Sequence, residues 1–111
     1  MAGAVHIPWY ATGFRGDKLE AALAEIAPIA LRYGATSYAV YRSDDDLYKF
    51  LQVATFKSHD DWDAYWAGPE FVRFRTLTSS WYQVPVLYSW HKVAAEGAMP
   101  EVVDLANAPG S

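Results

Sequence analysis

Three histidines and a group of tryptophans supply the side chains of this sequence that could do chemistry. His6 and His91 lie near the two ends of the first 93 residues. Imidazole exchanges protons near neutral pH, so either histidine is a candidate general base. Two histidines without a carboxylate at a fixed spacing are a weak metal signal, and we predict no metal site. The plainer interpretation is that His6 and His91 are two polar side chains on a sheet and that His59 is solvated at the start of a helix.

Aromatic side chains recur at helical spacing directly after a strand-like stretch. Ser58 stands three residues before Asp61, the spacing at which a serine hydroxyl accepts the N–H of the later residue and begins a helix. Trp62, Tyr65 and Trp66 then fall on one face of that helix. Such a face packs on a sheet, where it forms either ordinary core or the wall of a pocket. We place Trp66 with the two histidines as the candidate catalytic residues.

Several strand and helix residues have polar ends that could orient a ligand. Arg42 is the best anchor for an anion, because a guanidinium can hold a carboxylate or a phenolate through two parallel hydrogen bonds. The other candidate substrate-binding residues are Tyr65, Tyr10, Gln52 and Trp90. Each of them alone is more simply explained as a structural residue. The acidic run 44–46 lies in a predicted hairpin turn and is expected to be solvated, not to bind a cation.

Composition narrows the class of protein. A chain of 111 residues forms one domain, and 16% aromatic residues exceed what a small core needs, which suggests an aromatic-lined cavity or an interface. The net charge of −4 with scattered basic residues argues against nucleic acid as a partner. Membrane spans and a secretory signal are not predicted. The absence of cysteine excludes disulfides and thiolate chemistry and is consistent with a cytoplasmic protein.

Several reaction classes lack their sequence motifs here. We find no nucleophile elbow, no glycine-rich phosphate loop and no dinucleotide-binding fingerprint. The sequence therefore predicts no cofactor.

The elements that must position these residues follow from periodicity and from turn residues. We predict strands at 4–10, 35–42, 47–56 and 83–93, and helices at 18–33, 60–66 and 69–77. Asp17 is the predicted N-cap of the first helix, Pro28 should kink it and Gly34 should end it. Pro69 suits the first turn of the third helix. Pro8 and Pro85 are expected at a bulge, an edge or a strand end.

The order β-α-β-β-α-β predicts an α+β, ferredoxin-like antiparallel sheet with its helices on one face, formed by residues 1–93. Such a sheet leaves its second face uncovered. If Tyr48, Phe50 or Tyr88 points there, a homodimer that pairs sheet against sheet would remove the apolar patch. Residues 94–111 are predicted to be a tail that is partly disordered or docks on the partner subunit through 100–105.

This arrangement resembles the dimeric α+β barrel superfamily and, within it, the antibiotic biosynthesis monooxygenase type. The matching features are the strand 47–56, the capped start Ser58–Asp61, the pair Tyr65-Trp66 and the break Ala67-Gly68-Pro69. The resemblance covers residues 4–93. It implies the same sheet-to-sheet homodimer.

The resemblance also implies an activity. Members of the monooxygenase group oxygenate electron-rich aromatic molecules, often without metal or flavin, and an Asn and a Trp usually take part. Trp66 matches that Trp, whereas the single asparagine, Asn107, lies in the tail. Relatives that degrade haem carry an axial histidine after the Gly-Pro break, and residues 70–75 contain none. This difference argues against haem binding of that kind.

Three functions remain open on the sequence. The first is a cofactor-independent oxygenase, or a cyclase-like enzyme, that acts on an aromatic or polyketide-like molecule in a Trp/Tyr-lined cavity. Trp66 and Tyr65 would line that cavity, Arg42 would hold an anion, and His6 or His91 would act as base. The second is a non-catalytic, ligand-binding or stress-related protein with the same cavity. The third is a structural homodimer whose aromatic residues are all core.

Overall fold

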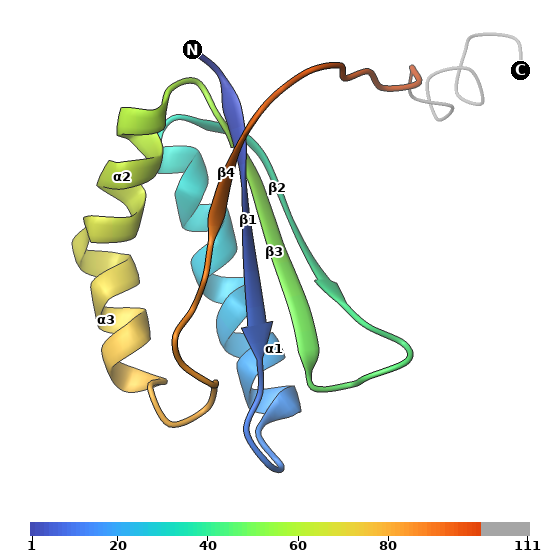
Figure 1. Ribbon diagram of the computed structural model, residues 1–111. Helices are drawn as coiled ribbons and strands as arrows, with labels where there is room; N and C mark the ends of the chain where they lie inside the picture. Colours follow the sequence, from blue (N-terminus) through green and yellow to red (C-terminus); the bar gives the residue numbers. More distant parts are fainter. Residues whose placement is uncertain (101–111) are drawn as a thin grey trace, which may run out of the picture.

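The computed structural model describes residues 1–100 as four strands and three α-helices, with a 3₁₀ helix after α1 (Figure 1). In chain order these are β1 (Gly3–Tyr10), α1 (Gly16–Ile26), the 3₁₀ helix η1 (Ala27–Tyr33), β2 (Ala35–Arg42), β3 (Lys49–Phe56), α2 (His59–Ala67), α3 (Pro69–Leu77) and β4 (Ser89–Lys92). The predicted β-α-β-β-α-β order is confirmed, with the second helical unit divided into α2 and α3.

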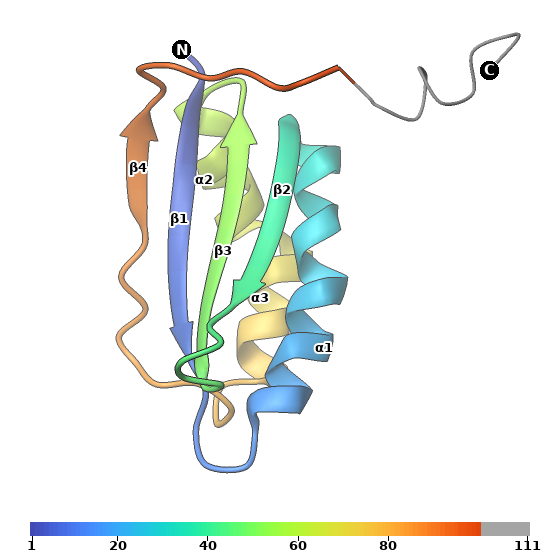
Figure 2. The ribbon, with the colours of Figure 1, turned by 90° about the vertical axis from the view of Figure 1, so that its right-hand side faces the viewer.

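The four strands form one antiparallel sheet in the order β2-β3-β1-β4. All three helices cover the same face, and the other face is open (Figures 1 and 2). This is the predicted ferredoxin-like α+β architecture. The sheet order places the first and last strands side by side, although they lie far apart in the sequence.

Local signals explain where most helices begin and end. The Ser58 hydroxyl accepts the Asp61 N–H at 3.2 Å, so the predicted cap of α2 is confirmed. Pro69 lies in the first turn of α3, where its missing N–H costs nothing. Gly34 ends η1 at φ 94°, a left-handed conformation that glycine adopts without steric cost.

The first helix differs from the prediction in two ways. Asp17 does not cap it: Arg15 holds the N-cap position without a side-chain bond, and Asp17 lies inside the first turn. Pro28 changes the helix type instead of kinking one long helix, because α1 ends at Ile26 and a 3₁₀ helix continues to Tyr33. Proline cannot donate the i→i−4 hydrogen bond that an α-helix needs at this point.

The core lies between the sheet and the helices and is built from alternate residues of the two central strands. Its largest fully buried side chains include Ile7, Trp9, Phe50, Phe56, Trp62, Tyr65 and Phe71. One line of polar groups crosses this core. Trp9 Nε1 donates to Gln52 Oε1 at 3.1 Å, Gln52 Nε2 donates to the Tyr65 hydroxyl at 3.2 Å, and that hydroxyl donates to the Ile26 carbonyl at 2.6 Å.

The last strand is shorter than predicted. Ladder pairing covers Ser89–Lys92 and not the whole range 83–93, and it reaches only Gly3–His6 of β1. Pro85 lies in the unpaired part, where it has no N–H to give to a ladder. Pro8 is tolerated in the central strand β1 for a related reason, since β4 has not yet begun alongside it.

The open face differs from the prediction in the residues that it presents. Phe50 points into the core and is 1% exposed, and Tyr88 packs on the helix side against Trp62 and Trp66. Tyr48 lies just before β3 and stacks on Tyr10 at 6.4 Å. Strand alternation instead turns these residues outward: Ala4, His6, Pro8, Tyr10, Ala39, Tyr41, Leu51 and Val53.

Within residues 1–100, no helix has the length and apolar character to cross a membrane. The predicted docking segment 100–105 falls almost wholly outside the described residues.

The Tyr65 hydroxyl should matter for stability. Tyr65→Phe would leave the Gln52 amide and the Ile26 carbonyl without their buried partner, so we expect the free energy of unfolding to fall by about 1–3 kcal/mol. Urea denaturation followed by circular dichroism measures this loss. Tyr38→Phe is the matched control, because Tyr38 is 43% exposed. Equal stability of both variants would show that the buried line of hydrogen bonds contributes nothing.

Candidate functional site

A cluster of aromatic rings lies at the outer edge of the core, where α2, α3 and the segment before β4 meet. Its centre is Trp66, which is half-buried. The Trp66 ring centroid lies 5.4 Å from that of Trp62, 5.0 Å from Phe71 and 5.1 Å from Tyr88. We call Trp62, Trp66, Phe71, Tyr88 and the neighbouring Arg75 the Trp66 site. Its rings come from three segments, α2, α3 and the stretch before β4, and the chain passes from α2 to α3 at the break Gly68-Pro69.

Arg75 brings a positive charge to this aromatic surface. Its guanidinium carbon lies 3.9 Å from the centroid of the Trp66 ring and 5.2 Å from that of Phe71, a cation–π arrangement. Its Nη1 donates to the Trp66 carbonyl at 2.8 Å. Within residues 1–100, no carboxylate lies at ion-pair distance from Arg75. Burial lowers its pKa, which reflects the cost of holding a charge among rings.

Two phenols lie beside this guanidinium. The Tyr82 hydroxyl donates to the Arg75 carbonyl at 3.3 Å. Burial raises the pKa of Tyr82, and the positive charge of Arg75 opposes part of that rise. Tyr88 covers the rings of Trp62 and Trp66 from the solvent side and is itself 40% exposed. The Trp66 site therefore combines flat apolar surfaces with one cation, which suits a flat anion.

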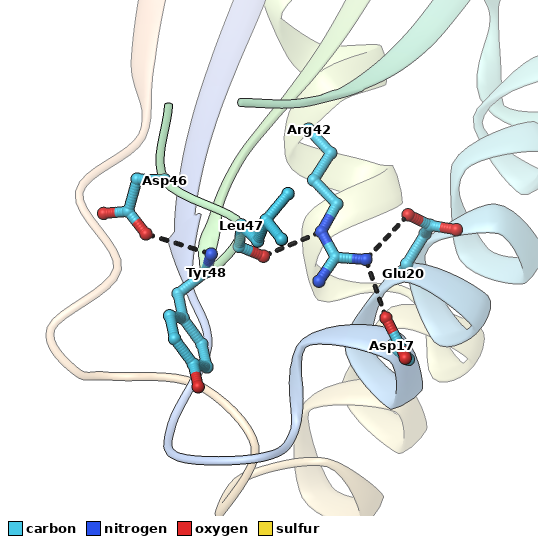
Figure 3. Close-up of polar contacts among 6 residues, drawn as sticks. All are labelled: Asp17, Glu20, Arg42, Asp46, Leu47 and Tyr48. Atoms are coloured by element: carbon cyan, nitrogen blue, oxygen red, sulfur yellow. Dashed lines mark hydrogen bonds and ion pairs between the residues drawn. The ribbon is translucent and has the colours of Figure 1, made fainter. Parts of the chain in front are cut away.

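Arg42, the predicted anion anchor, is already engaged by two carboxylates and a carbonyl of its own chain. Its Nε donates to the Leu47 carbonyl at 2.7 Å, and its Nη1 donates to Asp17 at 2.9 Å and to Glu20 at 3.1 Å (Figure 3). The guanidinium also lies 5.0 Å from the Phe50 ring. The hydrogen bond that Arg42 donates to Asp17 raises the Arg42 pKa, burial opposes this rise, and the hydrogen bond donated to Glu20 adds a smaller increase. This arrangement makes Arg42 a clamp between β2, α1 and the β2–β3 turn.

Two of the predicted ligand-binding residues belong to the core. Tyr65 and Gln52 are each 1% exposed, and their polar atoms bond to each other and to neighbours of the same chain. Burial raises the pKa of Tyr65, so its phenol stays protonated. The cavity that we expected between sheet and helices is occupied by these side chains.

The remaining predicted binding residues lie apart from Trp66 and from each other. The Tyr10 hydroxyl donates to Asp46 Oδ2 at 2.6 Å, which raises the Tyr10 pKa and lowers that of Asp46. Asp46 also accepts the Tyr48 N–H at 3.0 Å (Figure 3). Trp90 lies at the other end of the sheet, where its ring is 4.8 Å from that of His59. Neither residue contributes to the Trp66 site.

His6 and His91 meet, as the sheet order requires. Their ring centroids are 4.5 Å apart, and His91 Nε2 lies 2.7 Å from the Ser89 hydroxyl. Both point outward from the sheet, because they alternate with the inward-facing Val5, Ile7 and Trp90. Trp66 lies on the helix side. The three residues that we predicted as one catalytic set therefore do not form one site within a single chain.

The described residues also hold no group of three potential metal ligands.

The sequence reasoning missed Arg75 and Tyr88. Arg75 follows Phe71 by four residues, the spacing that puts both on one helix face, and this signal was available. Tyr88 lies in a segment that we expected to be a regular strand, so its turn toward α2 could not be predicted.

Arg42 should therefore contribute to stability and not to ligand affinity. We expect Arg42→Gln to lower the midpoint of thermal unfolding, because Asp17, Glu20 and the Leu47 carbonyl lose their common partner. Binding of an anionic aromatic ligand should stay unchanged in a fluorescence titration. Arg32→Gln is the control, since the Arg32 contact with Glu70 is 4.0 Å long and solvent-exposed. Weakened binding at an unchanged midpoint would restore Arg42 as the anion anchor.

Comparison with known proteins supports the fold. No family model matches the sequence, and no curated protein matches it. Rv0793 from Mycobacterium tuberculosis superposes with a TM-score of 0.77 at 18% identity, over 88% of this chain and 100% of that chain. A provisionally named antibiotic biosynthesis monooxygenase from Nitrosomonas europaea gives a TM-score of 0.76 at 14% identity, over 86% and 94% of the two chains.

A third similar structure is a variant of SnoaB from Streptomyces nogalater, a cofactor-independent oxygenase. It gives a TM-score of 0.72 at 18% identity and covers 90% of this chain and 98% of that chain. The chain thus has the ferredoxin-like α+β fold of these structures, which is the fold that the sequence predicted.

Proposed function

We propose that this chain binds an electron-rich aromatic or polyketide-like anion at the Trp66 site and oxygenates it without a metal or an organic cofactor. The observation that carries the proposal is the Arg75 guanidinium, stacked 3.9 Å from the Trp66 ring centroid with no carboxylate partner in residues 1–100. The fold that the chain shares with a cofactor-independent oxygenase supports the choice of reaction.

The site offers two kinds of attraction to such a ligand. The half-buried Trp66 ring provides a flat apolar surface, which binds a fused aromatic system by stacking. Arg75 uses Nη1 for the Trp66 carbonyl, and its other N–H groups can donate to a phenolate or an enolate. Partial burial strengthens that charge–charge attraction relative to water.

The chemistry requires little of the protein beyond binding and charge stabilisation. A ring methylene next to a carbonyl loses a proton to form a delocalised anion, which Arg75 stabilises. This anion gives electrons to O₂ and forms a carbon–oxygen bond. The resulting peroxide anion takes up a proton from water, in place of the proton that the methylene released to water, and the hydroperoxide then loses water to leave a ketone. The balance is R₂CH₂ + O₂ → R₂CO + H₂O. The groups around Trp66 are rings and one guanidinium, so the site favours a substrate acidic enough to bind as its anion.

Non-catalytic binding of the same kind of ligand is the second candidate, because the Arg75–Trp66 stack supports binding as directly as it supports turnover. Oxygen consumption separates the two. A ligand that binds without oxygen uptake identifies a binding protein.

A hydroxyanthrone tests the proposal. We expect the protein to accelerate O₂ uptake by 1,8-dihydroxyanthrone and to form the corresponding anthraquinone, measured with an oxygen electrode and by absorbance. Arg75→Gln should lower the rate roughly 10-fold to 100-fold, the effect of a lost charged hydrogen bond of about 1.5–3 kcal/mol. Arg73→Gln is the matched control, because Arg73 is exposed on the same helix and faces the groove between α1 and α3. Equal rates for the two variants would exclude Arg75 from the reaction.

We also infer that a second copy of the chain covers the open sheet face. Leu51 and Val53 of β3 lie there beside Ala39 and the 60%-exposed Tyr41 of β2, so a monomer would leave a continuous apolar strip in water. A two-fold axis would bring this strip against its own copy. In such a dimer, His6 and His91 of each subunit would lie at the edge of the interface or within it.

Charge on this face should separate the subunits. We expect Val53→Asp to convert a dimer into a folded monomer, measured as mass by light scattering after size exclusion and as an unchanged far-UV spectrum. Val72→Asp is the control, because Val72 is a 43%-exposed residue on the helix side. A wild-type protein of monomer mass would refute the interface. Phe50→Asp is unsuitable, since it would place a charge in the core of one subunit.

A further inference from the structure

Trp62 holds a buried polar atom that its own chain leaves without a partner. The side chain is 0% exposed, and Nε1 makes no hydrogen bond within the described residues. Indole nitrogen is a donor only, so it needs an oxygen or a similar acceptor. A buried donor without an acceptor is costly and rare, and it calls for an explanation.

The surroundings of Trp62 are aromatic and offer it no strong acceptor. Its ring centroid lies 4.9 Å from that of Tyr88, 5.4 Å from Trp66 and 6.0 Å from Phe56. The contact with Tyr88 is edge-to-face, at an interplanar angle of 66°. An aromatic face accepts an N–H only weakly, so these rings do not replace a carbonyl oxygen.

The ring that covers Trp62 is carried by a loosely held segment. Residues 84–88 take part in none of the turn and loop backbone hydrogen bonds of the described chain. Val84 is 74% exposed and Leu87 is 71% exposed, so the apolar packing of the segment rests on Val86, which is partly buried against the core, and on Tyr88 itself. Figure 2 shows it leading into β4 at the outer edge of β1, where no further strand confines it. Moving the Tyr88 ring therefore breaks few interactions.

We propose that the Trp62 indole N–H binds a ring-carbonyl oxygen of an aromatic ligand that takes the place of the Tyr88 ring against Trp62 and Trp66. Trp62 and Trp66 are one helical turn apart on α2 and their centroids are 5.4 Å apart, so one fused ring system can contact both. Arg75, stacked on Trp66, holds the anionic end of the same ligand. This inference rests on the proposed function and adds the residue that recognises a ring-carbonyl oxygen of the ligand, Trp62.

A pair of ligands that differ in the carbonyl groups tests this assignment. Anthraquinone-2-sulfonate and anthracene-2-sulfonate share the ring outline and the charge, but only the first has ring-carbonyl oxygens. We expect wild-type protein to bind the quinone roughly fivefold more tightly in calorimetric titrations, which corresponds to about 1 kcal/mol for one net hydrogen bond. Trp62→Phe keeps a ring in place and removes the donor, so its two affinities should become equal.

A second measurement avoids the variant, in case the smaller ring disturbs the core. In ¹⁵N-labelled wild-type protein, the indole N–H signal of Trp62 should move downfield with the quinone and stay in place with the anthracene. Trp62→Phe serves there only to assign the signal. Trp81→Phe is the control for indole loss, because Trp81 lies in the groove between α1 and α3.

The outcomes separate this inference from the proposed function. If neither ligand binds, both fail together. If both bind wild type equally and the Trp62 signal does not move, the aromatic site stands and Trp62 is not its donor. A preference for the quinone that survives in Trp62→Phe would also overturn the assignment, because the donor would then be another group.

Discussion

The organisation of this domain depends on how the space between the sheet and its helices is filled. Trp9, Gln52 and Tyr65 occupy the middle of that space, and a line of hydrogen bonds ends on the carbonyl of Ile26, the last residue of α1. Each polar atom on this line has a partner, so the line joins β1, β3, α2 and α1 without the cost of an unsatisfied group. Because these side chains fill the centre, the proposed ligand would bind at the rim, where Trp66 is half-buried.

Much of the fold could be predicted because its signals are local. The serine cap at Ser58, the break at Gly68-Pro69 and the left-handed Gly34 each depend on a few neighbouring residues, and all three have the structure that the sequence predicts. The length of β4 was not predicted correctly, since a strand exists only as far as its neighbour pairs with it. Asp17 shows the same limit: its type suits an N-cap, yet its side chain bonds to Arg42 on another element.

The candidate site was harder to predict, because its residues are selected by long-range pairing. Nothing in the sequence distinguishes Arg42 from Arg75 as an anion anchor. The structure does, since α1 supplies two carboxylates to Arg42, whereas Arg75 meets rings and one carbonyl. His6 and His91 were correctly placed on adjacent strands by the element order. Their face could not be predicted, because it depends on which alternate residues of β1 the helices cover. The helices cover Val5, Ile7 and Trp9, so the histidines lie on the opposite face of the sheet.

The rim of the core also explains how this site could discriminate among flat molecules. Stacking on Trp66 is insensitive to the identity of the ligand's ring, so it gives affinity with little selectivity. Two hydrogen-bond donors in this apolar surface add selectivity: the guanidinium of Arg75 and the indole N–H of Trp62. A site with buried donors rejects a ligand that lacks the matching oxygen, because the donor then stays unpaired. The unpartnered N–H of Trp62 destabilises the empty site relative to one that holds a carbonyl oxygen, and the loose segment 84–88 keeps the cost of admitting that oxygen low.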